Sequence, residues 1–138
     1  MNADLVSLVK LGYGDLFGKD ARLLHFRTDN LKWNDAAEAV ALVDEYNEYN
    51  GAEVAAAIPK IRDICRDSYQ LSFEFGREFS PVLYIHIPFW IKEPGRDARP
   101  LSADETAEMI YKVQEIGRSL RADENGIAYA HVIRLWWD

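Results

Sequence analysis

The sequence predicts an α+β fold in which helices cover one face of a sheet to form a two-layer α/β sandwich. Two alternating runs of apolar and polar residues within residues 69–91 indicate a β-hairpin, the centre of this prediction. Residues 102–121 combine an S-x-x-E capping box with an apolar stripe at helical spacing, which predicts a helix. The chain has 138 residues, of which 49% are hydrophobic, so we expect residues 1–138 to form a single domain with one core.

The residues before the hairpin alternate between helical and strand patterns. Residues 2–11 are expected to form an extra N-terminal helix, and the alternation of residues 21–28 predicts the first strand. Residues 35–49 are expected to form a helix, because acidic residues in the first turn suit the helix dipole and an apolar stripe follows. Asn50 and Gly51 are typical of the end of a helix.

A second helical pattern follows between Val54 and Cys65, with apolar residues at spacings of three and four. Pro59 lies inside this pattern and cannot donate the hydrogen bond that an interior helical position requires. We therefore expect a kink or a restart at Pro59. Together with the helix at residues 35–49, this pattern predicts a first crossover that is split into two helical pieces.

The hairpin and the last strand have two distinct faces. The apolar residues of the two hairpin arms share one face and should lie against the helices: Leu71, Phe73, Phe75, Leu83, Ile85, Ile87 and Phe89. Residues 127–137 are predicted to form a single last strand. The alternation of that strand places four residues on the uncovered face, where a partner, a dimer mate or the N-terminal helix would cover them: Tyr129, Ile133, Leu135 and Trp137.

The predicted order after the N-terminal helix is β-α-β-β-α-β, which is the order of a ferredoxin-like sandwich. In that layout the first strand lies between the second arm of the hairpin and the last strand, and the first arm is an edge. A meander with a different strand order is the alternative.

The charge of the chain limits the classes of partner. The net charge is −7, which argues against binding to nucleic acid or to an anionic membrane, because phosphate groups require clustered Lys and Arg. Residues 29–53 hold seven acidic residues and one basic residue, a net charge of −6, which leaves −1 for the rest of the chain. The excess of negative charge is therefore concentrated in one segment.

That acidic segment supplies the candidate binding residues. Acidic side chains one turn apart repel each other, and this arrangement is more favourable if a basic partner docks on the same surface. Tyrosines beside acidic residues are typical of protein-binding hot spots. The predicted partner-binding residues are Asp35, Glu38, Asp44, Glu45, Tyr46, Glu48, Tyr49 and Glu53.

Three histidines form an alternative candidate site. His25, His86 and His131 fall on predicted strands with the parity of the open sheet face. Glu74 and Tyr84 share that face, and three imidazoles can bind zinc. The sequence nevertheless lacks the H-E-x-x-H and C-x-x-C metal motifs, so we predict no metal site and no cofactor.

Cys65 is the only cysteine, so an internal disulfide is excluded, and its place on an apolar stripe favours packing over nucleophilic catalysis. A single cysteine fits a reducing compartment. The first residues lack the basic start and apolar core of a signal peptide, and no apolar run approaches the ~20 residues of a membrane span. These observations predict a cytoplasmic location.

The first functional hypothesis is a small acidic, non-enzymatic protein that neutralises a basic protein partner. Its expected form is an immunity protein or antitoxin that blocks a nuclease-like toxin, or a phage-encoded inhibitor. The alternative is an enzyme, or a protein that binds a small ligand or a metal, using the open sheet face around His25, His86 and His131. A homodimer joined through the open face is a further alternative.

Overall fold

The computed structural model describes most of the chain from the first strand onward. The described residues are 24–26, 33–41, 45–46, 48–66, 68, 70–78 and 80–138. The predicted N-terminal helix at residues 2–11 lies outside them.

The described strands form a five-stranded sheet and two small ribbons, and all paired strands are antiparallel. Across the sheet, the order is β1 (Leu24–Phe26), β4 (Ser72–Glu78), β5 (Ser80–His86), β9 (Val132–Trp136) and β8 (Glu124–Tyr129). The ribbons pair β2 (Glu45–Tyr46) with β3 (Tyr49–Asn50), and β6 (Trp90–Ile91) with β7 (Arg99–Pro100).

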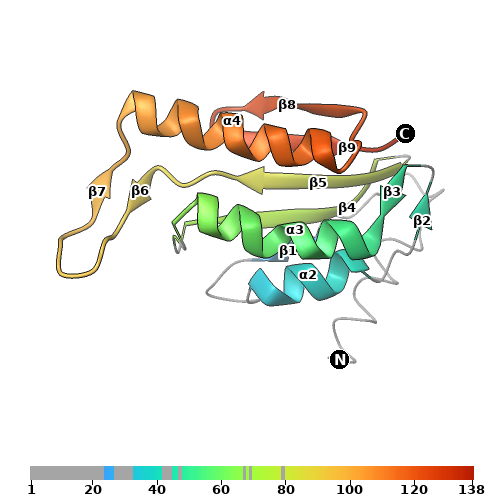
Figure 1. Ribbon diagram of the computed structural model, residues 1–138, viewed down its shortest axis with the longest axis horizontal. Coiled ribbons are helices and arrows are strands. Elements are labelled where there is room, and N and C mark those ends of the chain that lie inside the picture. Colours follow the sequence, from blue (N-terminus) through green and yellow to red (C-terminus); the bar gives the residue numbers. More distant parts are fainter. Residues whose placement is uncertain are drawn as a thin grey trace.

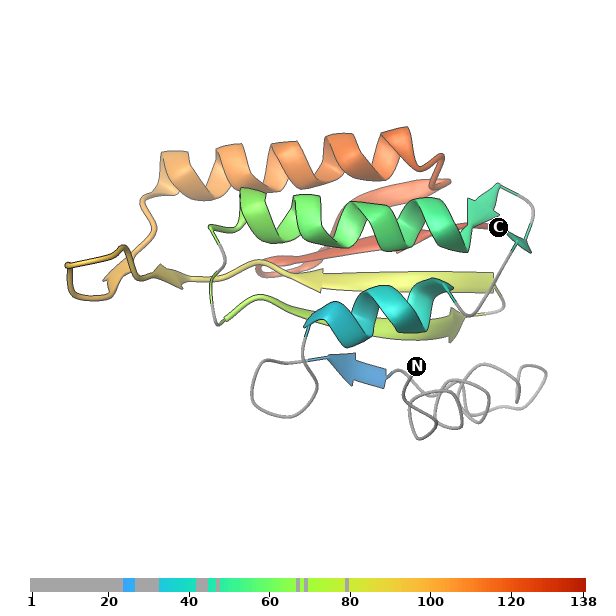
Figure 2. The ribbon, with the colours of Figure 1, turned by 60° about the horizontal axis from the view of Figure 1, so that its bottom comes forward.

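Three described helices lie on the same side of this sheet (Figures 1 and 2): α2 (Trp33–Ala41), α3 (Gly51–Ile64) and α4 (Ala103–Ser119). Buried side chains from all three helices join the apolar face of the sheet in one core. The predicted α+β class is therefore confirmed. None of the described helices has an apolar stretch long enough to cross a membrane.

The predicted hairpin is confirmed as β4 and β5. Its register places Phe73 opposite Ile85 and Phe75 opposite Leu83. All four side chains are buried in the core. Because burying a large apolar side chain contributes about 1.5–3 kcal/mol, this hairpin is the main surface on which the helices pack.

The predicted capping box of α4 is also confirmed. Ser102 Oγ accepts a hydrogen bond from the Glu105 N–H, and Glu105 Oε1 accepts one from the Ser102 N–H, both at 3.1 Å. Gly117 allows α4 to approach β9 closely, since a Cβ at this position would lie 2.5 Å from Leu135 Cδ2. The helix is thus held at its start by side-chain hydrogen bonds and near its end by close packing.

The predicted helix at residues 35–49 is wrong in its second half. α2 ends at Ala41, and the β2–β3 ribbon follows it. Asn50 begins the next helix, because its side chain accepts a hydrogen bond from the Glu53 N–H at 3.1 Å. Asparagine suits both the start and the end of a helix, so the residue type alone does not distinguish the two positions.

The predicted restart at Pro59 is not found, because α3 is a single helix with Pro59 inside it. An interior proline disfavours a helix by about 3 kcal/mol. Val54, Ile58 and Ile61 are fully buried on the same helix, and each contributes roughly 1.5–3 kcal/mol. Burial of the apolar stripe therefore outweighs the hydrogen bond that proline removes.

The predicted single strand at residues 127–137 is instead part of a hairpin. β8 and β9 are joined by a turn in which Ala130 has a φ of 42°. This turn reverses the chain inside the predicted strand. Ile133, Leu135 and Trp137 consequently lie in the helix-covered core and not on the uncovered face.

The observed strand order is not the predicted ferredoxin-like order. β1 pairs with β4 instead of β5, and β9 pairs with β5. Because the C-terminal segment folds back on itself, it adds two antiparallel strands on one side of β5. The alternative expectation, a meander with a different strand order, is closer to this arrangement.

Candidate functional site

Part of the predicted acidic surface lies at one end of the molecule. Figure 1 shows β2, β3 and the C-terminus at this end, where α3 begins and α4 ends. Glu48 lies in the turn between β2 and β3, and Glu53 in the first turn of α3. Arg121 follows the end of α4. Three separate segments therefore bring these side chains together.

Glu48 and Glu53 converge on Arg121. Arg121 Nε lies 3.2 Å from Glu48 Oε2, and Arg121 Nη2 donates a hydrogen bond to Glu53 Oε2 at 2.9 Å. The three side chains are 47–63% exposed. Exposed ion pairs of this kind contribute about 0–1 kcal/mol. Two carboxylates that share one guanidinium can thus bind a second cation with little loss of stability.

Further carboxylates extend this surface. Asp123 Oδ2 accepts a hydrogen bond from the Asp138 N–H at 2.8 Å, and Glu124 Oε2 accepts one from Arg134 Nη1 at 2.7 Å. We call this surface the acidic end, and it comprises Glu48, Glu53, Arg121, Asp123, Glu124 and Asp138.

Tyr49, a predicted binding residue, is 1% exposed and belongs to the core. Its hydroxyl donates a hydrogen bond to the Val40 carbonyl at 2.6 Å. Its ring meets the Trp137 ring edge-on, with 5.0 Å between the centroids. Tyr49 therefore anchors the β2–β3 ribbon and is not available at the surface.

The other predicted binding residues lie on α2, on β2 or outside the described residues. Glu38 lies on α2, and its Oε2 is buried without a hydrogen-bond partner in the described part of the chain. The backbone places Asp35 in α2 and Glu45 and Tyr46 in β2. Asp44 lies outside the described residues. Of the eight predicted residues, the structure therefore brings together Glu48 and Glu53.

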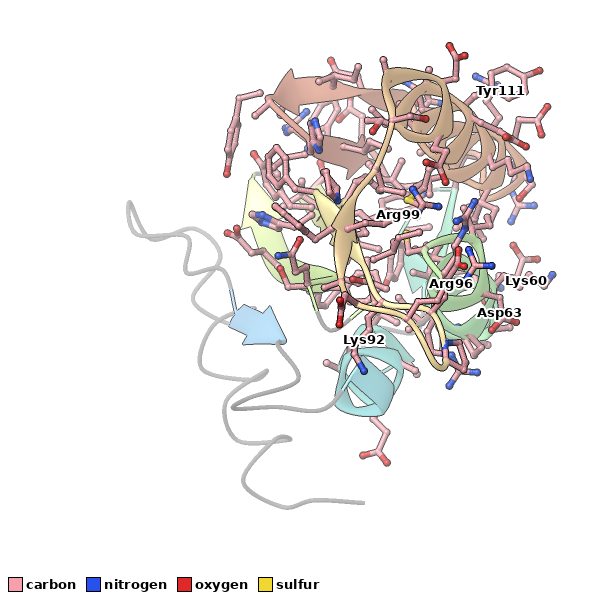
Figure 3. All side chains as sticks on the ribbon, turned by 90° about the vertical axis from the view of Figure 1, so that its left-hand side faces the viewer. Lys60, Asp63, Lys92, Arg96, Arg99 and Tyr111 are labelled. Atoms are coloured by element: carbon pink, nitrogen blue, oxygen red, sulfur yellow. The ribbon has the colours of Figure 1, made fainter. Side chains whose placement is uncertain are left out.

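The opposite end of the molecule carries the β6–β7 ribbon, residues 90–100, which we call the arm. Residues 60–67 and 92–99 contain six basic and four acidic residues. Figure 3 views the molecule from this end and shows Lys92, Arg96 and Arg99 on the arm. The two ends therefore carry different balances of charge.

A network of ion pairs joins the arm to α3 and α4. Arg99 donates to both oxygens of Glu105, at 2.7 and 2.9 Å, and Arg66 Nη1 lies 3.0 Å from Glu105 Oε2. Arg66 and Arg99 also lie 3.4 and 3.5 Å from Glu93 Oε1. The hydrogen bonds from Arg99 hold the pKa of Glu105 well below its usual range. In this network the charges of Arg66 and Arg99 thus neutralise those of Glu93 and Glu105.

The open sheet face brings two of the predicted residues into contact. His86 Nε2 contacts Glu74 Oε1, and the register places the backbone of His25 opposite Glu74. His131 lies in the β8–β9 turn, where its ring stacks on Phe89 with 3.8 Å between the centroids. Phe89 is 53% exposed and does not share the core face, contrary to the prediction. Among the described residues, no three His, Cys, Asp or Glu are placed to hold a metal ion.

Cys65 is fully buried in the core. Burial raises the pKa of its thiol to about 12, because the thiolate loses its hydration. A nucleophilic cysteine requires the thiolate form. This environment therefore fits a packing role.

Comparisons with protein-family models, with curated proteins and with solved structures found no match. The candidate site is accordingly defined by geometry. Sequence reasoning missed Arg121, which lies 68 residues from Glu53 along the chain. A basic residue near the end of a helix is a common feature, so no local signal links Arg121 to the acidic segment.

Proposed function

We propose that this chain is a small, non-enzymatic binding protein that neutralises a basic protein partner. In its most specific form, it is an immunity protein or antitoxin that blocks a nuclease-like toxin; a phage-encoded inhibitor would act in the same way. The observation that supports this proposal is the convergence of exposed Glu48 and Glu53 on one guanidinium at the acidic end.

The geometry of this site suits recognition of an arginine or lysine. Carboxylates that already hold Arg121 at 2.9 and 3.2 Å are placed to accept hydrogen bonds from a guanidinium. A partner's cation would join or replace Arg121. Because these groups are exposed and the chain carries a net charge of −7, they would also steer a basic partner during association.

We assign the remaining predicted binding residues to the same partner-binding surface. Asp35, Glu38, Asp44 and Glu45 come from the same acidic segment as Glu48 and Glu53. Tyr49 contributes from the core, by fixing the ribbon that carries Glu48. A nuclease cleft lined with Lys and Arg is a partner of the complementary charge.

The test first asks whether a nuclease domain is encoded beside this gene, and then measures inhibition of that domain by this chain. We expect such a domain to bind with an association rate that falls steeply as salt increases. The double variant Glu48→Lys/Glu53→Lys should associate more than about tenfold more slowly. The matched control is Asp97→Lys/Glu108→Lys, which makes the same change in net charge at exposed positions outside the acidic end.

Two outcomes would contradict the proposal. One is that no nuclease domain encoded beside this gene is bound or inhibited by the wild-type chain. The other is binding whose rate and salt dependence are the same for wild type and for the double variant at Glu48 and Glu53.

A second candidate function uses the open sheet face. The contact between Glu74 and His86 favours it, because a carboxylate beside an imidazole is a common arrangement for proton transfer or ligand binding. Metal analysis of untagged protein tests the form of this function that includes His25 and His131. Zinc below one equivalent that is unchanged in His86→Ala would exclude it.

A further inference from the structure

β8 is one of the two edge strands of the sheet in the described part of the chain, and β1 is the other. Two of its large apolar side chains are more than half exposed, Ile127 at 55% and Tyr129 at 57%. Natural edge strands are commonly protected by lysine, proline or a bulge. Residues 124–129 contain no lysine and no proline, and the bulge comes only after Ile127. In the part of the chain that the structure describes, no strand pairs with the outer side of β8, so a regular edge is open over residues 124–127.

The hydrogen bonds of β9 define which of its backbone groups point to β8. The Trp137 N–H donates to the carbonyl of Pro81 in β5 at 3.1 Å, so the odd-numbered residues point to β5. Backbone groups of successive residues point to opposite sides of a strand, so the even-numbered residues of β9 point to β8. The hydrogen bond from the Asp123 N–H to the Trp136 carbonyl, at 2.8 Å, agrees with this direction.

The same alternation defines the free edge of β8. Gly126 lies opposite Arg134, an even-numbered residue of β9, so its backbone groups point inward to β9. Its neighbours Asn125 and Ile127 therefore point their N–H and C=O groups outward. Gln114 Nε2 already donates to the Asn125 carbonyl at 3.0 Å. The Asn125 N–H and both backbone groups of Ile127 remain directed at the open edge.

α4 provides a wall beside this edge. Gln114 and Asn125 bind each other's backbone carbonyls, which places this side of α4 against β8. Ile110 lies one turn before Gln114 on the same side of the helix and is half-buried. Ile127 faces the same layer, since it lies opposite the buried Ile133. A strand added beside β8 would cover Ile110 and Ile127.

The acidic residues near this edge favour one kind of added strand, a basic one. β8 begins at Glu124, and Asp123 precedes it, so the edge is continuous with the acidic end. A second copy of this chain would bring another net charge of −7 to the contact. An extended segment with basic residues brings the complementary charge.

We infer that the free edge of β8 takes an extended, basic segment of the partner as a sixth strand of the sheet. Strand addition of this kind uses backbone hydrogen bonds for affinity and alternate side chains for specificity. The alternate apolar side chains of the segment lie on Ile110 and Ile127, and its basic residues lie near Asp123 and Glu124. This inference rests on the proposed function, and it names the place and the mode of docking.

The experiment selects peptides from a displayed library of random linear sequences and measures their affinities. We expect the selected peptides to alternate apolar residues with Lys and Arg. Ile127→Pro should weaken their binding at least about tenfold, because it removes an outward N–H and the apolar side chain. That variant keeps the inward hydrogen bonds of β8, and proline is tolerated on an edge strand. The matched control Ile127→Val keeps the N–H and most of the apolar surface.

Hydrogen exchange provides a second readout that does not depend on a variant. The amide protons of Asn125 and Ile127 should become protected when the selected peptide binds. A peptide methylated on the backbone nitrogens that face β8 should not bind, whereas one methylated on the nitrogens that face away should still bind. An empty selection would overturn the inference. So would unchanged affinity in Ile127→Pro together with unprotected amides at Asn125 and Ile127. If the chain forms dimers and Ile127→Pro abolishes them, the edge of β8 binds a second copy of the chain instead.

The same variants separate this inference from the proposed function. If Ile127→Pro still inhibits the nuclease while Glu48→Lys/Glu53→Lys does not, the acidic end binds the partner and strand addition is excluded. If the wild-type chain inhibits no neighbouring nuclease, the proposed function fails, whether or not β8 binds the selected peptides.

Discussion

The acidic end and the arm with its contacts on α4 differ in how many basic side chains pair with each carboxylate. At the arm, Glu105 receives two hydrogen bonds from Arg99 and an ion pair from Arg66. At the acidic end, two carboxylates share Arg121. Local charge density therefore does not identify a binding surface by itself, because the number of cations within reach decides which carboxylates are available to a partner.

The largest expected effect concerns the support of the acidic end. Tyr49→Ala should lower the free energy of unfolding by about 3–5 kcal/mol, because it removes a buried aromatic ring. Urea unfolding measures this loss. The control Tyr49→Phe keeps the ring and removes the hydrogen bond to the Val40 carbonyl, so it should lose about 1–3 kcal/mol. If Tyr49→Ala unfolds at the urea concentration of the wild type, the anchoring role of Tyr49 is wrong.

A smaller effect, visible in acid, concerns the arm. The hydrogen bonds from Arg99 lower the pKa of Glu105 in the folded chain below the ordinary value of 4.5. The contribution of Glu105 to stability is therefore present above about pH 4.5 and is lost as the pH falls below that value. Glu105→Gln should lower stability at neutral pH and flatten the decrease in acid, measured by urea unfolding across a pH series.

The control for this prediction lies on the same helix. Glu108 pairs with Lys112 at 3.0 Å, and both side chains are more than half exposed. Glu108→Gln should therefore leave the shape of the pH profile unchanged. Identical profiles for wild type and Glu105→Gln would show that Arg99 does not stabilise the charged form of Glu105.

The smallest expected effect concerns Arg121. Arg121→Ala should lower the free energy of unfolding by less than about 1 kcal/mol, because its ion pairs are exposed and screened by salt. Thermal unfolding at low and high salt measures this change, with Lys112→Ala as a matched exposed pair. A loss above about 2 kcal/mol would mean that the acidic end needs Arg121 for folding, and that its carboxylates are not available to a partner.

Elements defined by local interactions could be predicted from the sequence. The β4–β5 hairpin follows from alternation over a few residues, and the start of α4 follows from Ser102 and Glu105. The predictions that failed involve residues whose role depends on distant packing. Asn50 caps the start of α3, and Pro59 is tolerated because the helix that contains it is buried against the core.

In the candidate site, too, local features could be predicted from the sequence and features that depend on distant packing could not. The sequence located the acidic segment, and Glu48 and Glu53 belong to it. It also placed Tyr49 among the surface residues, because a tyrosine between acidic residues has the composition of a binding surface. The structure buries Tyr49 because its ring packs on Trp137, which lies 88 positions later in the chain.

By itself, the sequence determined the α+β class, the central hairpin, the capped helix α4 and the concentration of negative charge. Only the tertiary structure decided that Arg121 meets Glu48 and Glu53, that Trp137 is buried and that β8 is an edge. The physical reason is one of range. Alternation and capping act between residues a few positions apart, whereas ion pairs, burial and strand order depend on segments that only folding brings together.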